Sequence, residues 1–478
     1  MALQTNNGGA LYELVARGVK DAYFFEDSTT AANPFRWSYE KYAAVSTETR
    51  TVRPYNAAGF SKVLNIDLDV YGDILQEAWI HIRLPSWVPS VYRAAAVKRG
   101  LVRDASGSSA LADATAYGYT SGIGYMLFEK VEVLQDNIVL QEVTGDALYV
   151  SSRHQQSYSA HHLTDALAGV YDEGDLLQIQ RSVDPGRDYI IELPFIRNFP
   201  LVALRGQRFR VRLTLRALED LVICSDLTVP KPAPWSVPAF LWATTDASGS
   251  FTPLALHELD APTITIEMTQ VYLSNEDREA LAGANFLIPY RRYISYNHFN
   301  FGPATYASLD NTPPVAPAAV VNYDGIYHVD RILHTVRSAR SLEANRRTAY
   351  NNVSVSGEFY IAGLQSAYGS TVRDQTWGPL VLNKLTQHAH AEYASAAQFL
   401  IQENGFKPSY TNRAPAQSYG PPAGLNYSEA SEPNVRVVLN DIQRDYYNNW
   451  KVAAYDIVLC ATAYYVVEKG RGGLAFLN

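Results

Sequence analysis

Hydrophobic and polar residues alternate along several stretches in the first half of the chain. Residues 63–70 and 77–84 carry an apolar side chain at nearly every second position, and the second stretch stops at Pro85. Successive side chains of a β-strand point to opposite faces, so this period of two predicts strands with one buried face. In the first stretch the residues expected on that face are Leu64, Ile66, Leu68 and Val70.

Two further patterns predict a strand and a hairpin. Residues 209–215 place Phe209, Val211, Leu213 and Leu215 inward and polar residues outward. Residues 128–133 and 138–143 flank Leu134-Gln135-Asp136-Asn137, which predicts a hairpin whose turn type stays open because it contains no glycine.

The second half contains strand patterns separated by long polar segments. Residues 263–273 predict a strand that runs into a helix, because Ser274 can cap the helix and the acidic Asp277 follows three residues later. Further β-rich stretches lie at 353–359, 435–439, 454–460 and 461–468.

Proline and glycine mark the connections. Residues 229–238 hold four prolines, too many for a strand inside a sheet, and predict a linker or surface loop. Residues 101–122, 302–319 and 408–433 are loop-like, and loops of this length usually carry surface function or are disordered. We expect several of them on the outward face of the protein.

An apolar stripe at helical spacing lies near the amino terminus. Its large members are Leu11, Leu14, Val15 and Val19, and charged residues lie between them. Such a stripe needs a partner surface. Two interpretations stay open: a short helix packed on its own domain, or an arm that docks onto neighbouring subunits or an underlying protein or membrane layer.

Composition narrows the classes of function. The 478 residues carry a net charge of -8, and the densest basic runs are pairs such as Arg291-Arg292, whereas nucleic-acid binding needs clustered cations. Two cysteines cannot build a disulfide framework, which fits a reducing compartment. Without an apolar run of about 18 residues or a signal-peptide pattern, neither membrane insertion nor secretion is expected.

No motif predicts catalytic, cofactor-binding or metal-binding residues. His388-Ala389-His390-Ala391-Glu392 could bind a metal on a strand, but its alanine-rich surroundings predict a helix that separates the histidines. His161-His162 lacks further ligands, and neither a phosphate-binding loop nor a nucleophile elbow occurs. Asn352 and Asn426 begin glycosylation triplets and are retained as possible modification sites.

Several segments, taken in order, resemble the double jelly-roll major capsid proteins of nucleocytoplasmic large DNA viruses. The resemblance is strongest at residues 8–23, 124–150, 193–215, 263–280 and 455–478. One departure is Asp277, which separates Glu276 from Arg278 where the family has a Glu-Arg pair. Residues 193–215 look like the end of the first jelly roll, and residues 263–273 look like the opening strand of the second.

The resemblance implies a mainly β fold of two tandem eight-stranded jelly-roll β-sandwiches, with short helices and long surface loops. The ranges expected are an amino-terminal arm at 1–30, a first jelly roll at 31–225, a Pro-rich connection at 226–256 and a second jelly roll at 257–478.

The function implied by the resemblance is structural rather than enzymatic. It is that of a major capsid protein whose homotrimers form pseudo-hexagonal capsomers of an icosahedral shell, with no cofactor and no direct contact with nucleic acid. Expected partners are neighbouring capsomers, minor capsid proteins and an inner membrane layer, in a virion assembled in the host cytoplasm. Two alternatives remain: a minor capsid, penton or scaffold protein on the same fold, and a β-sandwich enzyme or carbohydrate-binding protein.

Overall fold

The computed structural model describes most of residues 45–85, 117–225, 244–245, 251–252, 261–299, 318–350, 361–382, 400–403, 424–439 and 452–475. The predicted arm, the Pro-rich segment 229–238, the strand at 353–359 and the His388 motif lie outside these residues. Among the helices described, none is both long and apolar enough to cross a membrane.

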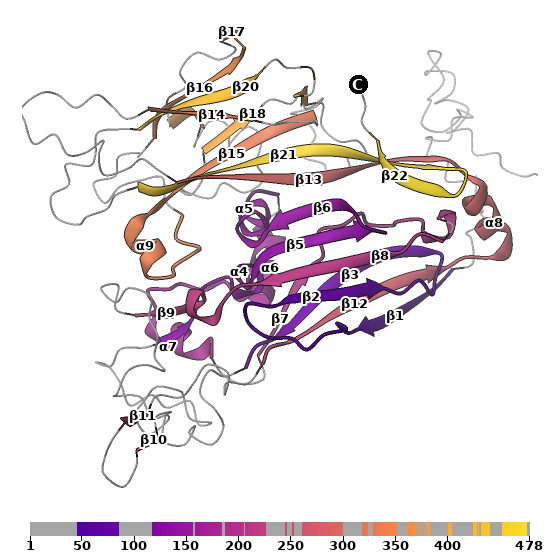
Figure 1. Cartoon of the computed structure of the whole chain (residues 1–478), viewed down its shortest axis with the longest axis horizontal. Coiled ribbons are helices and arrows are strands. Elements are labelled where there is room, and N and C mark those ends of the chain that lie inside the picture. The colour runs from indigo at the N-terminus through magenta and orange to yellow at the C-terminus, as the bar shows by residue number, and fades with distance from the viewer. Residues whose placement is uncertain are drawn as a thin grey trace, which may run out of the picture. The chain divides into compact units, whose positions relative to one another are not determined.

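The first half of the described chain forms a sandwich of two antiparallel four-stranded sheets (Figure 1). One sheet has the order β1 (Ser46–Val52), β12 (Thr263–Tyr272), β3 (Ile74–Arg83) and β7 (Asp188–Glu192). The other has the order β2 (Val63–Leu68), β8 (Phe209–Leu215), β5 (Phe128–Gln135) and β6 (Ile138–Thr144). Ranked by their position along the chain, these eight strands read 1-8-3-6 in one sheet and 2-7-4-5 in the other.

The second half repeats the same order. One sheet contains β13 (Phe286–Phe299), β21 (Val452–Glu468), β15 (His328–Ser338) and β18 (Leu400–Glu403). The other contains β14 (Ala318–Asn322), β20 (Pro433–Leu439), β16 (Ile361–Tyr368) and β17 (Thr371–Val372). With the short β19 (Leu425–Asn426) and β22 (Arg471–Ala475) set aside as additions, the ranks are again 1-8-3-6 and 2-7-4-5, so the chain holds two tandem jelly rolls.

Short helices and ribbons complete the described residues. The helices are α4 (Ile123–Met126), α5 (Gly145–Gln155), α6 (Tyr158–Ala168), α7 (Leu176–Arg181), α8 (Asn275–Gly283) and α9 (Ala339–Glu343), with 3-10 turns at Leu201–Ala203 and Leu218–Asp220. Two ribbons pair β4 (Tyr117–Tyr119) with β9 (Val222–Cys224) and β10 (Thr244–Thr245) with β11 (Phe251–Thr252).

The alternating patterns fold as the sequence predicts. Leu64, Ile66 and Leu68 are buried on β2, and Phe209, Val211, Leu213 and Leu215 on β8 are at most 1% exposed. Val70 is an exception, with 54% exposure, because β2 ends at Leu68 and the alternation no longer applies beyond it.

The predicted hairpin is confirmed. β5 and β6 are joined through Asp136 and Asn137, and Asp136 adopts a left-handed backbone with φ 54°. Its carboxylate accepts a hydrogen bond from the Arg208 backbone amide at 3.0 Å, which anchors the turn without a glycine. The hairpin leads directly into α5.

The assignment of residues 263–272 to the start of the second jelly roll is wrong. β12 pairs with β1 and β3, so it is the last strand of the first sandwich, and β8, expected to close that sandwich, is the seventh. The alternating pattern predicted a strand correctly, but it carries no information on pairing partners that lie more than 150 residues away. The predicted cap is present: Ser274 accepts a hydrogen bond from the backbone amide of Asp277 at 3.3 Å and starts α8.

Candidate functional site: the junction between the two jelly rolls

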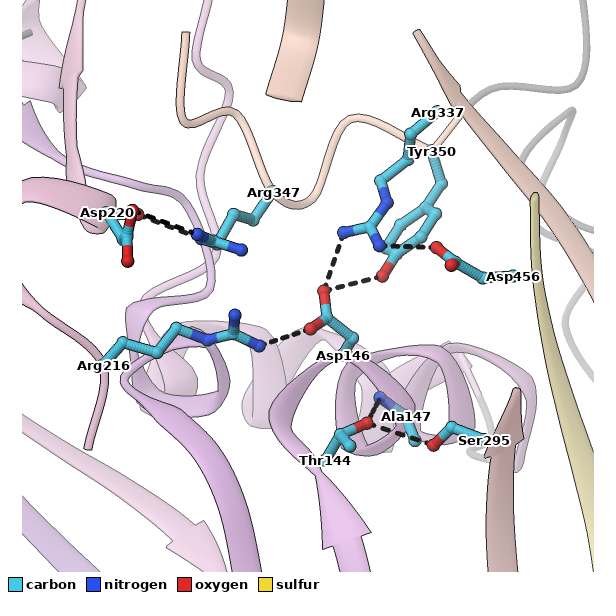
Figure 2. A network of polar contacts seen from close by, with 10 residues as sticks. All are labelled: Thr144, Asp146, Ala147, Arg216, Asp220, Ser295, Arg337, Arg347, Tyr350 and Asp456. Carbon is cyan, nitrogen blue, oxygen red and sulfur yellow. Dashed lines mark hydrogen bonds and ion pairs between the residues drawn. The ribbon is translucent and has the colours of Figure 1, made fainter. Parts of the chain in front are cut away.

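A buried network of charged side chains joins the two jelly rolls. Figure 2 shows Asp146 on the first turn of α5 facing Arg337 of β15, with Asp456 of β21 beyond it. Figure 1 places α5 beside β5 and β6, below the long strands β13 and β21. The first sandwich thus contributes α5, and the second contributes strands from its six-stranded sheet.

Asp146 is the centre of the network. Its Oδ1 accepts hydrogen bonds from Arg337 Nη1 at 2.8 Å and from the Tyr350 hydroxyl at 3.1 Å. Its Oδ2 pairs with Arg216, which follows β8. One carboxylate therefore binds donors from both sandwiches.

Arg337 lies between two carboxylates. Its Nη1 binds Asp146, and its Nη2 lies 2.6 Å from Asp456 Oδ2. The guanidinium is also 4.8 Å from the centre of the Tyr350 ring, within cation–π range. Only 4% of the Arg337 side chain is exposed, so these contacts replace nearly all of its hydration.

The two carboxylates differ in their electrostatic environment. Burial by itself would raise the pKa of Asp146, but the guanidiniums of Arg337, Arg216 and Arg347 outweigh it and hold that pKa well below the usual range. For Asp456 burial prevails over the attraction of Arg337, and its pKa rises to about 6. The pKa values of two acids bound to one arginine are thus shifted in opposite directions.

The segment that follows α9 anchors the second jelly roll to the first. Asn345 adopts a left-handed backbone with φ 60° and donates its side-chain amide to the carbonyls of Glu219 and Val222 at 2.6 and 2.8 Å. Arg347 Nε donates to the Asp220 carbonyl at 3.0 Å. These hydrogen bonds link the two sandwiches. They give donors to backbone carbonyls of residues 219–222 in the first sandwich.

A second buried acid lies beside this segment. Glu173 accepts hydrogen bonds from the Ser121 amide at 2.8 Å and from the Thr120 hydroxyl at 3.1 Å, and Arg346 lies 3.9 Å away. Burial raises the pKa of Glu173.

Near the other end of β21, glutamine side chains bind the final strand. The Tyr465 hydroxyl donates to Gln135 Oε1 at 2.9 Å, and both Gln135 and Gln207 donate to the Gly472 carbonyl at 3.1 Å. The Gly472 amide in turn donates to Gln207 Oε1 at 2.7 Å. Gly470, with φ 81°, forms the preceding turn, a backbone conformation that favours glycine.

The chemistry of the junction is that of attachment. Its groups are paired acids, arginines, amides and tyrosines, and within the described residues no set of three histidines, cysteines or acids is placed to hold a metal ion. What the arrangement can do is fix one jelly roll against the other.

Among the described residues, the junction contains no residue of the site predicted from sequence. Leu11, Leu14, Val15, Val19 and Asn352 are outside the described residues. Asn426 lies half-buried in β19, opposite His328 of β15. His162 is exposed on α6.

Sequence reasoning missed Asp146, Arg337 and Asp456 because single acids and arginines form no local motif. The one available signal was a charged residue inside an apolar strand pattern, as at Asp456 between Tyr455 and Ile457.

Comparison with known proteins reveals the same fold. No protein-family model matches the sequence, and no curated protein is similar to it in sequence. The chain is similar in structure to a quasi-atomic model of the PBCV-1 virus capsid, with a TM-score of 0.64, 11% identity, and coverage of 93% of this chain and 100% of that one. It is also similar to the Faustovirus major capsid protein, with a TM-score of 0.57, 10% identity, and coverage of 92% and 93%.

These similarities establish the class of fold. At such low identity they carry the architecture alone, and the chain has the double jelly-roll fold found in viral major capsid proteins.

Proposed function

We propose that this protein is a structural subunit of a viral shell, the major capsid protein of a large icosahedral DNA virus. The observation that carries the proposal is the repeat of one eight-strand order in both halves of the chain. Two equivalent sandwiches suit a protein whose task is to tile a surface. The similarity in fold to the PBCV-1 capsid and to the Faustovirus major capsid protein supports it.

In this proposal the assembly unit is a homotrimer. Three chains with two jelly rolls each present six similar lobes, which gives a pseudo-hexagonal outline. Burial of apolar surface and shape fit would hold the trimer together, with more reversible polar contacts between trimers. The border between the two jelly rolls is then near α8, directly after β12.

Partners and the place of assembly follow from the same role in a shell. The arm would dock onto neighbouring capsomers, minor capsid proteins or an inner membrane layer, and the virion would assemble in the host cytoplasm. We propose neither enzymatic activity nor direct contact with the genome, consistent with a net charge of -8.

Multi-angle light scattering of the purified chain tests the trimer. The expected mass is three times the 53.1 kDa of one chain, with a hexagonal outline in electron micrographs of the same sample. A monomer throughout the micromolar concentration range would refute the proposed assembly unit.

A further inference from the structure

Two carboxylates at the junction share one guanidinium unequally (Figure 2). Asp146 has three donors: Arg337, Arg216 and the Tyr350 hydroxyl. Asp456 has Arg337 as its only charged partner among the described residues, and no donor from those residues reaches its Oδ1. Both groups are buried, so the less satisfied carboxylate is the one whose negative charge is costly.

The groups around Asp456 define what its charge faces. Its neighbours on the adjacent strands are Asn297 of β13 and Thr335 of β15, which are uncharged. Among the described residues, the titratable or charged groups that interact with Asp456 are Arg337 of β15, Asp146 of α5, Tyr350 and the adjacent Tyr455 of β21. Arg216, Arg347 and the half-exposed Asp220 lie beyond Asp146.

With every acid ionised, this network is balanced in charge. Asp146, Asp220 and Asp456 offset Arg216, Arg337 and Arg347. Of the two buried acids, Asp146 and Asp456, the one that loses least by accepting a proton is the one neutralised first. Asp146 would give up contacts with two arginines, whereas Asp456 would weaken only one.

We propose that Asp456 is a proton sensor of the junction: mild acidification neutralises Asp456 while Asp146 keeps its charge, so Arg337 binds Asp146 alone and the junction between the jelly rolls becomes more stable. This behaviour belongs to the single chain and does not depend on the proposed role in a shell.

The direction of this pH effect follows from the protonation of Asp456 in the folded chain and in the unfolded chain. Burial, only partly offset by Arg337, raises the pKa of Asp456 to about 6, above the value of about 3.9 expected in the unfolded chain. Between these values the folded protein binds the proton more tightly than the unfolded protein does. The contribution of Asp456 to stability therefore rises as the pH falls from about 6 towards about 4.

Thermal unfolding of the full chain tests this proposal. Tm is measured at pH 7.5 and pH 5.0 for the wild type and for Asp456→Asn, which keeps the shape but cannot ionise. At pH 7.5 we expect the Tm of the variant to equal or exceed that of the wild type. At pH 5.0 the Tm of the wild type should rise relative to that of the variant. Hydrogen exchange of residues 344–350, corrected for the intrinsic effect of pH, should slow at pH 5.0 in the wild type only.

The matched control is Asp67→Asn. Asp67 pairs with Arg210 at 2.7 Å on the outer face of the first sandwich, and that contact lowers its pKa, so it stays ionised at both pH values. The change in Tm caused by Asp67→Asn should therefore be the same at pH 7.5 and at pH 5.0.

Two outcomes would overturn the proposal. One is an equal loss of Tm at both pH values in Asp456→Asn, which would make Asp456 an ordinary ion-pair partner. The other is failure to fold at pH 7.5 of both Asp456→Asn and the similarly sized Asp456→Leu, because Arg337 keeps Asp146 as its partner when position 456 is uncharged.

Discussion

At the residue scale, Asp146 is the carboxylate at the centre of the junction. It is a buried anion that receives donors from the end of β8, from β15 and from Tyr350, so its removal leaves Arg216 and Arg337 without their shared partner. Removing one partner of a buried ion pair lowers the free energy of unfolding much more than removing an exposed pair does, because the remaining charge stays buried.

We therefore expect Asp146→Asn to lower the free energy of unfolding by about 3–5 kcal/mol. Urea denaturation measures this change, with Asp67→Asn as the control expected to lose no more than about 1 kcal/mol. An Asp146 variant within that smaller range would show that the junction is not stabilised by this charge.

Acid titration gives a separate prediction for the same residue. Arginine contacts outweigh burial and keep the pKa of Asp146 well below its usual range, so its stabilisation is present above about pH 4. It should be lost as the pH falls further, through the lowered pKa. Equilibrium unfolding followed from pH 5 to pH 2 should show a steeper loss in the wild type than in Asp146→Asn; parallel curves would contradict this assignment.

At the element scale, β22 is held by close backbone approach rather than by a large side chain. A Cβ added to Gly472 would overlap the Tyr465 hydroxyl and come within 2.7 Å of Leu204 Cδ2. At the adjacent Gly473 nothing lies within 4 Å of such an atom. The two neighbouring glycines therefore serve as test and control for the effect of an added side chain.

Gly472→Ala should destabilise the protein by about 1–3 kcal/mol, because overpacking forces Tyr465 and its bond to Gln135 to shift. Gly473→Ala should change stability by less than about 0.5 kcal/mol. Thermal unfolding of both variants checks the contrast, and equal effects would argue against close packing of β22.

At the scale of the whole molecule, two jelly rolls that are fixed to each other act as one building block. Both ends of β21 take part: Asp456 lies in the charged network, and Tyr465 binds Gln135 of the first sandwich. In a shell subunit with a rigid junction, a contact that moves one jelly roll would move the other with it.

The amino-terminal stripe belongs to this scale because its proposed role is assembly. Changing Leu11, Leu14 and Val15 together to Ser should leave the trimer folded and impair shell formation or attachment to inner layers. Light scattering and electron microscopy separate these effects, and changing Glu13, Arg17 and Lys20 to Ser provides the control. A large fall in Tm of the isolated subunit would instead make the stripe ordinary core.

The sequence by itself determined the local elements. Alternation predicted β2, β3 and β8, the polar turn at Asp136 predicted the hairpin, and Ser274 with Asp277 predicted the start of α8. Such features depend on neighbours within a few residues, where side-chain period and capping are set directly by the order of residues.

Only the tertiary structure decided the pairings between distant segments. β12 joined the first sandwich although it follows the Pro-rich segment, and Asp146, Arg337 and Asp456 met from positions 310 residues apart at the extremes. Strand pairing and buried charge networks depend on which surfaces come together on folding, and no local pattern records that choice.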